Sequence, residues 1–116
     1  MTVERLHHAA FTVTDLDAAI AFYRILGFEP IERPDFGFPG AWLQADQAQV
    51  HLLESSELPP SPGTHVALKV GDLEALVSQL EGAGLRVGRL AHVPGAGRQA
   101  FVNDPSGNQI ELNQPD

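Results

Sequence analysis

The chain has 116 residues and no cysteine, so disulfides, thiolate metal sites and cysteine nucleophiles are excluded. Fifteen acidic residues against seven basic ones give a formal charge of −8, which argues against a nucleic acid or an anionic membrane as partner. No apolar run approaches the roughly 20 residues of a membrane span, and the start MTVERLHH shows no secretory signal. We therefore expect a cytoplasmic protein.

The sequence repeats itself at an offset of 57 residues, at which seven of the 21 positions from 8 to 28 are identical. Identical pairs include His8 and His65, Asp15 and Asp72, and Gly27 and Gly84. Self-similarity of this kind indicates a duplicated structural unit. We predict one domain, residues 1–116, made of two modules at about 5–57 and 63–114 that a Pro/Ser-rich linker joins.

The first module opens with an alternating strand over 7–13, followed by a helix. Thr14 or Asp15 can cap this helix. An apolar stripe runs along it through Leu16, Ile20 and Tyr23. Two short strands are then expected, near 41–45 and 48–53.

The second module has the same order of elements. Its first strand covers 64–70, and Asp72 can cap a helix that ends at Gly82 or Gly84. Three further strands are expected near 86–92, 99–103 and 108–113, with a strong turn signal in Asp104-Pro105-Ser106-Gly107. Each half therefore reads β-α-β-β-β, and the fold class is α+β.

Four ionisable side chains stand on the predicted strands, each on the face opposite to the one that suits a helix: His8, His51, His65 and Glu111. Imidazole nitrogen and carboxylate oxygen suit a divalent metal ion such as Zn, Ni, Fe(II), Mn or Co. A lone histidine in a half-buried strand is more often a polar residue than a ligand. Because the repeat places His8 and His65 at equivalent positions, it strengthens the interpretation that these side chains form a metal site with three or four protein ligands.

The segments LHHAAFTVTDLDAAIAFYRILGFEP, QVHLLE, HVALKVGDLEAL and FVNDPSGNQIELN resemble the vicinal oxygen chelate superfamily of glyoxalases, bleomycin resistance proteins and dioxygenases. The resemblance covers about residues 5–113 and implies two βαβββ modules that form a partly closed mixed β-barrel around a metal cleft. It assigns His8, His65 and Glu111 as metal ligands. His51 falls at the place of a fourth ligand, which in glyoxalase I is usually a glutamate.

The resemblance implies a metal-dependent, glyoxalase-I-like lyase or isomerase that acts on a small oxygen-chelating substrate. Glu111 would then be both ligand and general base, and His51 a second acid–base residue, although histidine at this place counts against glutathione-dependent activity. The alternatives are an extradiol-type dioxygenase, with Fe(II) bound by His8, His65 and Glu111, and a non-catalytic drug-binding protein of the bleomycin-resistance kind. A fosfomycin-type thiol transferase is a further option, although the residues that bind the phosphonate in that family are not evident in this sequence. A homodimer is also implied, because small two-module members are usually dimers.

The substrate pocket is expected to include aromatic side chains and a cation. Phe36 and Trp42 are candidates for its walls, and Arg33 or Arg98 for the group that grips a carboxylate of the substrate. Core packing for the aromatic residues and a solvated surface for the arginines are the competing interpretations.

Overall fold

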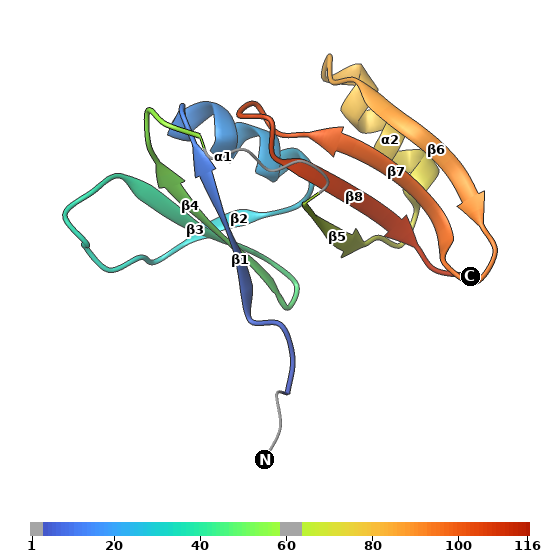
Figure 1. Ribbon diagram of the computed structural model, residues 1–116, viewed down its shortest axis with the longest axis horizontal. Helices are drawn as coiled ribbons and strands as arrows, with labels where there is room; N and C mark the ends of the chain where they lie inside the picture. The colour runs from blue at the N-terminus through green and yellow to red at the C-terminus, as the bar shows by residue number, and fades with distance from the viewer. Residues whose placement is uncertain (1–3, 59–63) are drawn as a thin grey trace. The chain divides into compact units, whose positions relative to one another are not determined.

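The computed structural model describes residues 4–58 and 64–116, and the chain divides into two compact units, Met1–Pro59 and Pro60–Asp116 (Figure 1). The division falls within the predicted linker, of which residues 59–63 lie outside the described part. That the two units form a single domain with the boundaries given above stays a prediction. Among the described residues, neither helix is long and apolar enough to cross a membrane.

The first unit consists of one helix and a mixed four-stranded sheet. Its elements are β1 (His8–Val13), α1 (Leu16–Ile25), β2 (Glu29–Ile31), β3 (Gly40–Ala45) and β4 (Ala48–Glu54). The strand order is β1-β4-β3-β2, with β1 parallel to β4 and the other pairs antiparallel. The three-residue strand β2 carries a proline and was not located by the sequence pattern, which is too short there to show alternation.

The second unit repeats this architecture. Its elements are β5 (His65–Lys69), α2 (Leu73–Gly82), β6 (Val87–Val93), β7 (Gly97–Asn103) and β8 (Gln109–Gln114). The strand order is β5-β8-β7-β6, and only β5 and β8 run parallel. The predicted pair of βαβββ modules with mixed sheets is therefore confirmed.

Both helices begin and end with the signals that the sequence offers. The carboxylates of Asp15 and Asp72 accept hydrogen bonds of 3.0 Å from the backbone N–H three residues further on, so Asp15 and not Thr14 is the cap of α1. Gly27 and Gly84 follow the helix ends with φ of 97° and 86°, a left-handed conformation that glycine adopts without steric cost.

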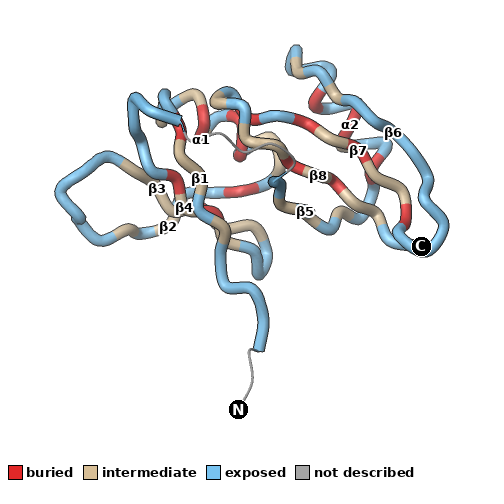
Figure 2. Tube along the Cα trace, viewed as in Figure 1, coloured by how far each residue is buried: buried red, intermediate tan, exposed pale blue. Residues whose placement is uncertain are grey.

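The core of each unit lies between its helix and the sheet face that the helix covers (Figure 2). On the strands, the deepest positions are Val13, Leu43 and Leu52 in the first unit and Ala100, Ile110 and Leu112 in the second. On α1, the buried residues are Ala19, Phe22 and Tyr23. The stripe predicted for α1 is thus right at Tyr23, whereas Leu16 and Ile20 are only half-buried at its edges.

A β-bulge interrupts β6. Gly88 pairs with Phe101 on β7, whereas Ala91 pairs with Gln99, so β6 contains one residue more than its partner over this stretch. Arg89 lies in the bulge with a φ of 55°, one of two non-glycine residues in the described part with positive φ. Such a conformation costs about 1–3 kcal/mol, which the pairing around it must offset.

The predicted turn between β7 and β8 is built around the side chain of Asp104, which is only 4% exposed. Its Oδ1 accepts from the backbone N–H groups of Ser106 (2.9 Å) and Asn108 (2.8 Å), and its Oδ2 accepts from the Asn108 amide (2.8 Å). This turn starts β8 and so sets the register of the strand that carries Glu111.

Candidate functional site

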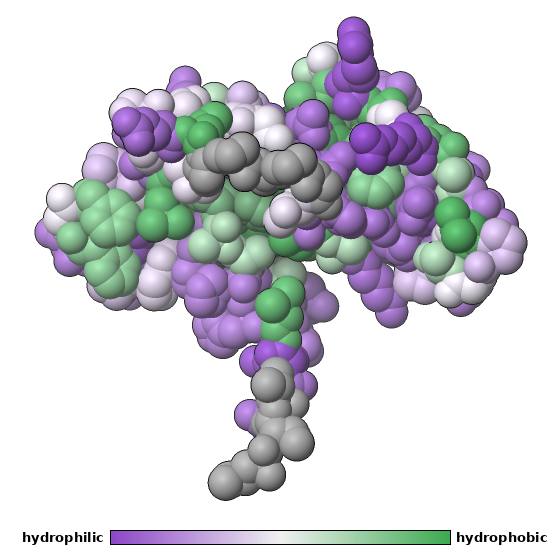
Figure 3. Space-filling model, in the orientation of Figure 1, coloured by the Kyte–Doolittle hydropathy of each residue, from purple (hydrophilic) through white to green (hydrophobic). Residues whose placement is uncertain are grey.

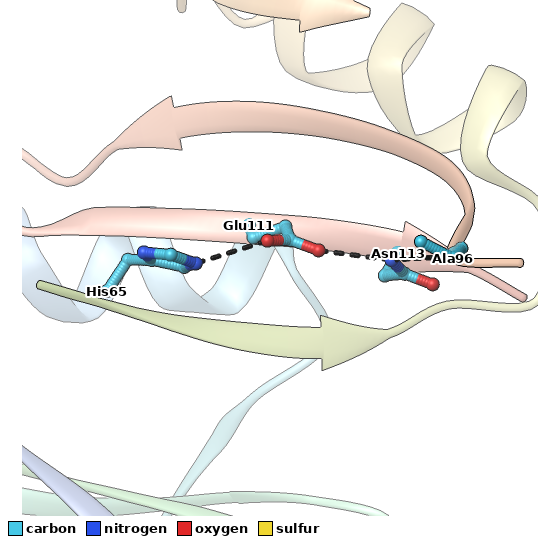
Figure 4. A network of polar contacts seen from close by, with 4 residues as sticks. All are labelled: His65, Ala96, Glu111 and Asn113. Carbon is cyan, nitrogen blue, oxygen red and sulfur yellow. Dashed lines mark hydrogen bonds and ion pairs between the residues drawn. The ribbon is translucent and has the colours of Figure 1, made fainter. Parts of the chain in front are cut away.

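The second unit brings together a histidine and a glutamate on its parallel strand pair. Nε2 of His65 on β5 lies 3.1 Å from Oε1 of Glu111 on β8 (Figure 4). Glu111 follows Ile110 and precedes Leu112, both buried against the helix, so its own side chain belongs to the opposite, open face of the sheet. The two side chains are 35% and 13% exposed, which leaves the histidine accessible and the carboxylate largely covered.

Asn113 holds the second oxygen of Glu111. Its amide nitrogen Nδ2 donates to Oε2 of Glu111 at 3.0 Å and to the backbone carbonyl of Ala96 at 3.0 Å (Figure 4). A primary amide carries two hydrogens, so both are used and the orientation of the amide is fixed. Sequence reasoning missed Asn113, although its place two residues after Glu111 on one strand puts both side chains on the same face.

The first unit stacks two of its histidines with its tryptophan. The rings of His8 and His51 are 3.8 Å apart between centroids and 15° from parallel, and those of His51 and Trp42 are 4.3 Å apart and 6° from parallel. Nε2 of His51 lies 3.1 Å from the side-chain oxygen of Gln49. His51 is thus held as the middle layer of a stack, which we call the three-ring stack.

The surroundings of His51 favour its neutral form. Burial lowers the pKa of the His51 imidazole, and electrostatic interactions with His8, His7 and Arg33 lower it further. Nδ1 of His7 lies 2.9 Å from Nδ1 of His8, so one of these two nitrogens carries the hydrogen and the other accepts it. The neutral imidazole is the form that binds a metal ion.

The loop between β2 and β3 carries aromatic side chains on the surface of the first unit. The guanidinium carbon of Arg33 lies 4.9 Å from the ring centroid of Phe36 and 5.0 Å from that of Phe38. Phe36 is 51% exposed and its ring is 6.1 Å from that of Trp42. In Figure 3 this loop bears a hydrophobic patch, so apolar surface lies open beside the three-ring stack.

Arg98 lies elsewhere. It alternates with Gln99 on β7 and falls on the same side as buried Ala100, facing the helix. There its guanidinium forms an ion pair of 2.7 Å with Glu74 in the first turn of α2. The structure therefore gives no support to Arg98 as a substrate-binding residue.

Each unit thus contains two of the four predicted ligands. His8 and His51 lie together on β1 and β4, and His65 and Glu111 on β5 and β8. Within residues 4–58 and 64–116, no group of three or more histidine, aspartate or glutamate side chains is assembled for a metal ion. That all four residues bind one ion stays a prediction.

Two βαβββ modules, each with an imidazole on its first strand and a donor side chain on its last, define a protein of the paired-module oxygen-chelate class. The sequence model described as Glyoxalase/Bleomycin resistance protein/Dioxygenase superfamily matches residues 5–112, and the chain belongs to this superfamily.

Several relatives have names that indicate their activities. The metallothiol transferase FosB of Shouchella clausii is 27% identical over 124 residues, which cover 96% of this chain and 80% of that protein. A structure of the fosfomycin resistance protein FosX from Listeria monocytogenes, complexed with Mn(II) and dihydroxypropylphosphonic acid, matches with a TM-score of 0.85 and 18% identity over 99% and 95% of the two chains. The antibiotic binding protein TnmS3 from Streptomyces sp. CB03234 matches with a TM-score of 0.82 and 27% identity over 100% and 99%.

Proposed function

We propose that the chain is a metal-dependent enzyme of the glyoxalase-I-like kind, a lyase or isomerase that acts on a small molecule with vicinal oxygens. The observation that carries this proposal is the pair of His65 and Glu111, whose facing atoms lie 3.1 Å apart on an open sheet face. A buried carboxylate next to an imidazole, with its second oxygen held by an amide, is a donor set built in advance.

The donor chemistry fits a divalent metal ion. His65 and Glu111 supply one imidazole nitrogen and one carboxylate oxygen, and His8 supplies a second imidazole, with His51 as a fourth ligand. The neutral form that His51 favours suits this role. Zn, Ni, Fe(II), Mn and Co all accept such ligands. When bound, the ion polarises a carbonyl oxygen of the substrate and stabilises negative charge that develops there.

The chain's own residues supply the proton transfer and the substrate contacts. Oε1 of Glu111 would take the proton from the hydroxyl-bearing carbon next to the carbonyl and return it to the former carbonyl carbon, while the hydroxyl proton passes to the former carbonyl oxygen. No atom is gained or lost, as an isomerisation requires. Asn113 keeps Oε2 of the same carboxylate in place throughout. His51 assists by exchanging a proton with a substrate oxygen.

Aromatic side chains and a cation of the first unit bind the rest of the substrate. Phe36 and Trp42 supply exposed or half-exposed ring surface, and Arg33, which lies over Phe36, supplies the positive charge for a carboxylate. Arg98 is left out, because its guanidinium is already paired with Glu74.

A non-catalytic, drug-binding function is the second candidate. Two observations favour it: the exposed rings of Phe36 and Phe38, and the 27% identity to the antibiotic binding protein TnmS3 over the full chain. An extradiol dioxygenase has no observation of this kind in its favour. A homodimer rests on the resemblance of the sequence to small two-module proteins, and light scattering of the purified chain tests it.

A measurement of metal binding distinguishes the proposed metal-dependent enzyme from a drug-binding protein. The purified chain is stripped with chelator and dialysed against each of the five metal ions, with Fe(II) handled without oxygen, and the bound metal is counted. We expect one ion per site in the wild type and a loss of affinity of at least about tenfold in His65→Ala and Glu111→Ala. His92→Ala, which removes an exposed histidine paired with Asp116, is the matched control and should bind as the wild type does.

Equal metal binding by wild type and by both variants would overturn the proposal. Turnover of the hemithioacetal of methylglyoxal and glutathione by the loaded protein then tests the glyoxalase substrate itself. A protein that binds metal but does not turn over this compound is an enzyme for another oxygen-chelating substrate, whereas a protein that binds no metal belongs with the drug-binding relatives.

A further inference from the structure

Arg89 is turned away from the side of the sheet to which strand alternation would assign it. In a regular strand the residue after Gly88, which pairs with Phe101, would pair with Ala100. Ala100 is fully buried on the face that α2 covers, so a side chain directly opposite it would point towards the core. The bulge and the left-handed backbone of Arg89 instead bring its guanidinium carbon to 5.1 Å from the centroid of the Phe101 ring.

The Phe101 ring lies on the same sheet face as the candidate metal ligands His65 and Glu111. Phe101 stands directly opposite Glu111 in the antiparallel pair of β7 and β8, so both side chains are on the same side of the sheet. Its ring also meets the ring of His65 edge-on, with 5.5 Å between the centroids. The guanidinium of Arg89 therefore contacts a ring that lies on the same sheet face as Glu111 and meets the ring of His65.

The guanidinium of Arg89 has no acidic partner within the described residues, whereas Arg24 and Arg98 are paired with Glu29 and Glu74. A cation–π contact with an aromatic ring uses the positive charge of a guanidinium but does not use up its N–H donors, so the N–H groups can still bind an anion. A backbone conformation that is rare for arginine, a charge without an acidic partner and a ring that holds it in place together suit a ligand-binding residue.

We propose that Arg89 binds an oxyanion, a carboxylate or a phosphate group, of the small molecule that occupies the open face of the second unit. The planar fork of guanidinium N–H groups matches two oxygens of such an anion. This inference rests on the proposed function for the identity of that molecule as substrate. It adds that the substrate carries negative charge close to the oxygens that the metal polarises.

The test uses the full chain labelled with ¹⁵N and stripped of metal, at about pH 8, where histidine side chains are ordinarily neutral. Acetate and inorganic phosphate are the anionic probes, and acetamide is the neutral probe of the same shape as acetate. The signals to follow are the side-chain N–H of Arg89 and the backbone N–H groups of Phe101 and Glu111.

Two variants remove the positive charge of Arg89, and a third variant removes a positive charge elsewhere as a control for the change in net charge. Arg89→Gln removes the guanidinium, and Arg89→Gly does so at a residue type that adopts positive φ freely, so the bulge is retained. Arg86→Gln lowers the net charge by the same amount from an exposed position just before β6. We expect saturable shifts with an anion in wild type and Arg86→Gln, and binding at least about tenfold weaker in both Arg89 variants.

The two anionic probes decide between a carboxylate and a phosphate. Equal shifts with acetamide, unchanged anion binding in Arg89→Gly, or no saturable shift with either anion would each overturn the inference. Metal binding, measured on the same proteins, is a separate readout that Arg89→Gly should not weaken, because the substitution removes a positive charge and no metal ligand. A wild type that binds anions through Arg89 but binds no metal would reject the proposed function alone, and one that binds metal but no anion would reject only this inference.

Discussion

His51 and Glu111 occupy equivalent places in the two units. On the parallel pair of β1 and β4, His51 stands opposite Ala10, and on the parallel pair of β5 and β8, Glu111 stands opposite Ala67. Ala10 and Ala67 are themselves matched by the 57-residue repeat. Each unit therefore presents its donors from the same two strands, an imidazole at the start of the first strand and a second donor in the middle of the last.

Asn113 is expected to set the metal affinity through Glu111. Asn113→Leu leaves Oε2 of Glu111 without its amide donor, and Asn113→Asp places a second carboxylate beside it. Partners of this kind are worth about 10–100-fold in metal affinity, so we expect a loss in that range for both variants. Equilibrium dialysis with Zn or Mn is the measurement.

The same substitution at another asparagine is the control for effects on folding. Asn103→Leu, on the exposed end of β7, should leave metal affinity and thermal unfolding close to the wild type. If Asn113→Leu bound metal as tightly as the wild type while remaining folded, Asn113 would have no part in positioning Glu111.

His51 is expected to make the metal-free protein less stable in acid. Because the pKa of the folded imidazole is lowered, the unfolded chain binds more protons than the folded one as the pH falls through about 6.5 and below. This contribution to the free energy of unfolding is therefore lost on acidification and regained as the pH rises. Thermal unfolding of wild type and His51→Gln between about pH 5 and pH 8 measures it.

The His51→Gln protein should lose less stability over this range than the wild type does. An Asn103→Gln control changes an exposed residue that does not titrate and should keep the wild-type difference between the two pH values. Identical curves for wild type and His51→Gln would show that the folded protein does not resist protonation of His51.

The hairpin between β6 and β7 contains two glycines whose substitution by alanine should have different costs. At one the cost is backbone strain alone, and at the other it is strain together with a steric clash. Both have positive φ, 84° at Gly95 and 87° at Gly97. A Cβ at Gly95 would meet nothing within 4 Å, whereas at Gly97 it would lie 2.5 Å from the backbone oxygen of Gln114. We expect Gly95→Ala to cost about 1–2 kcal/mol of stability and Gly97→Ala clearly more, as measured by urea unfolding.

Gly97→Ala should also weaken metal binding, because the clash displaces the end of β8 and the Ala96 carbonyl that fixes Asn113. If the two alanine variants were equally stable, the hairpin would be able to move away from β8 and relieve the clash without any loss in the free energy of unfolding.

Asp104 is expected to stabilise the turn before β8. Asp104→Ala removes one acceptor for two backbone N–H groups and another for the Asn108 amide, which should cost about 2 kcal/mol or more. Asp104→Asn keeps the shape and one carbonyl oxygen, so its loss should be smaller. Urea unfolding of the wild type and the two variants measures these losses in the free energy of unfolding. If Asp104→Asn lost as much stability as Asp104→Ala, the charge of Asp104 rather than its shape would be what stabilises the turn.

The sequence predicted the duplicated module because its signals are local. The caps Asp15 and Asp72 and the alternation of apolar residues act over a few positions, and they appear twice. The same locality explains the misses. Arg89 adopts its bulged conformation because of pairing with β7, and Asn113 reaches the Ala96 carbonyl only once β8 meets the β6–β7 hairpin.

The equivalence of His51 and Glu111 was also hidden from the sequence. Glu111 lies 60 residues after His51, three more than the repeat offset of 57, so sliding the chain does not superimpose them. Strand register shows it directly, because each residue pairs with the matched alanine of its own unit.

The three-ring stack gives the protein a built-in optical reporter. Trp42 is the single tryptophan of the chain, so all indole fluorescence comes from a ring that lies 4.3 Å from His51. A neighbouring imidazole quenches indole emission much more strongly when it is protonated than when it is neutral, and a bound transition-metal ion changes the emission as well. Emission intensity therefore follows the state of one named side chain, and a titration of protons, metal or ligand can be read from it without any label.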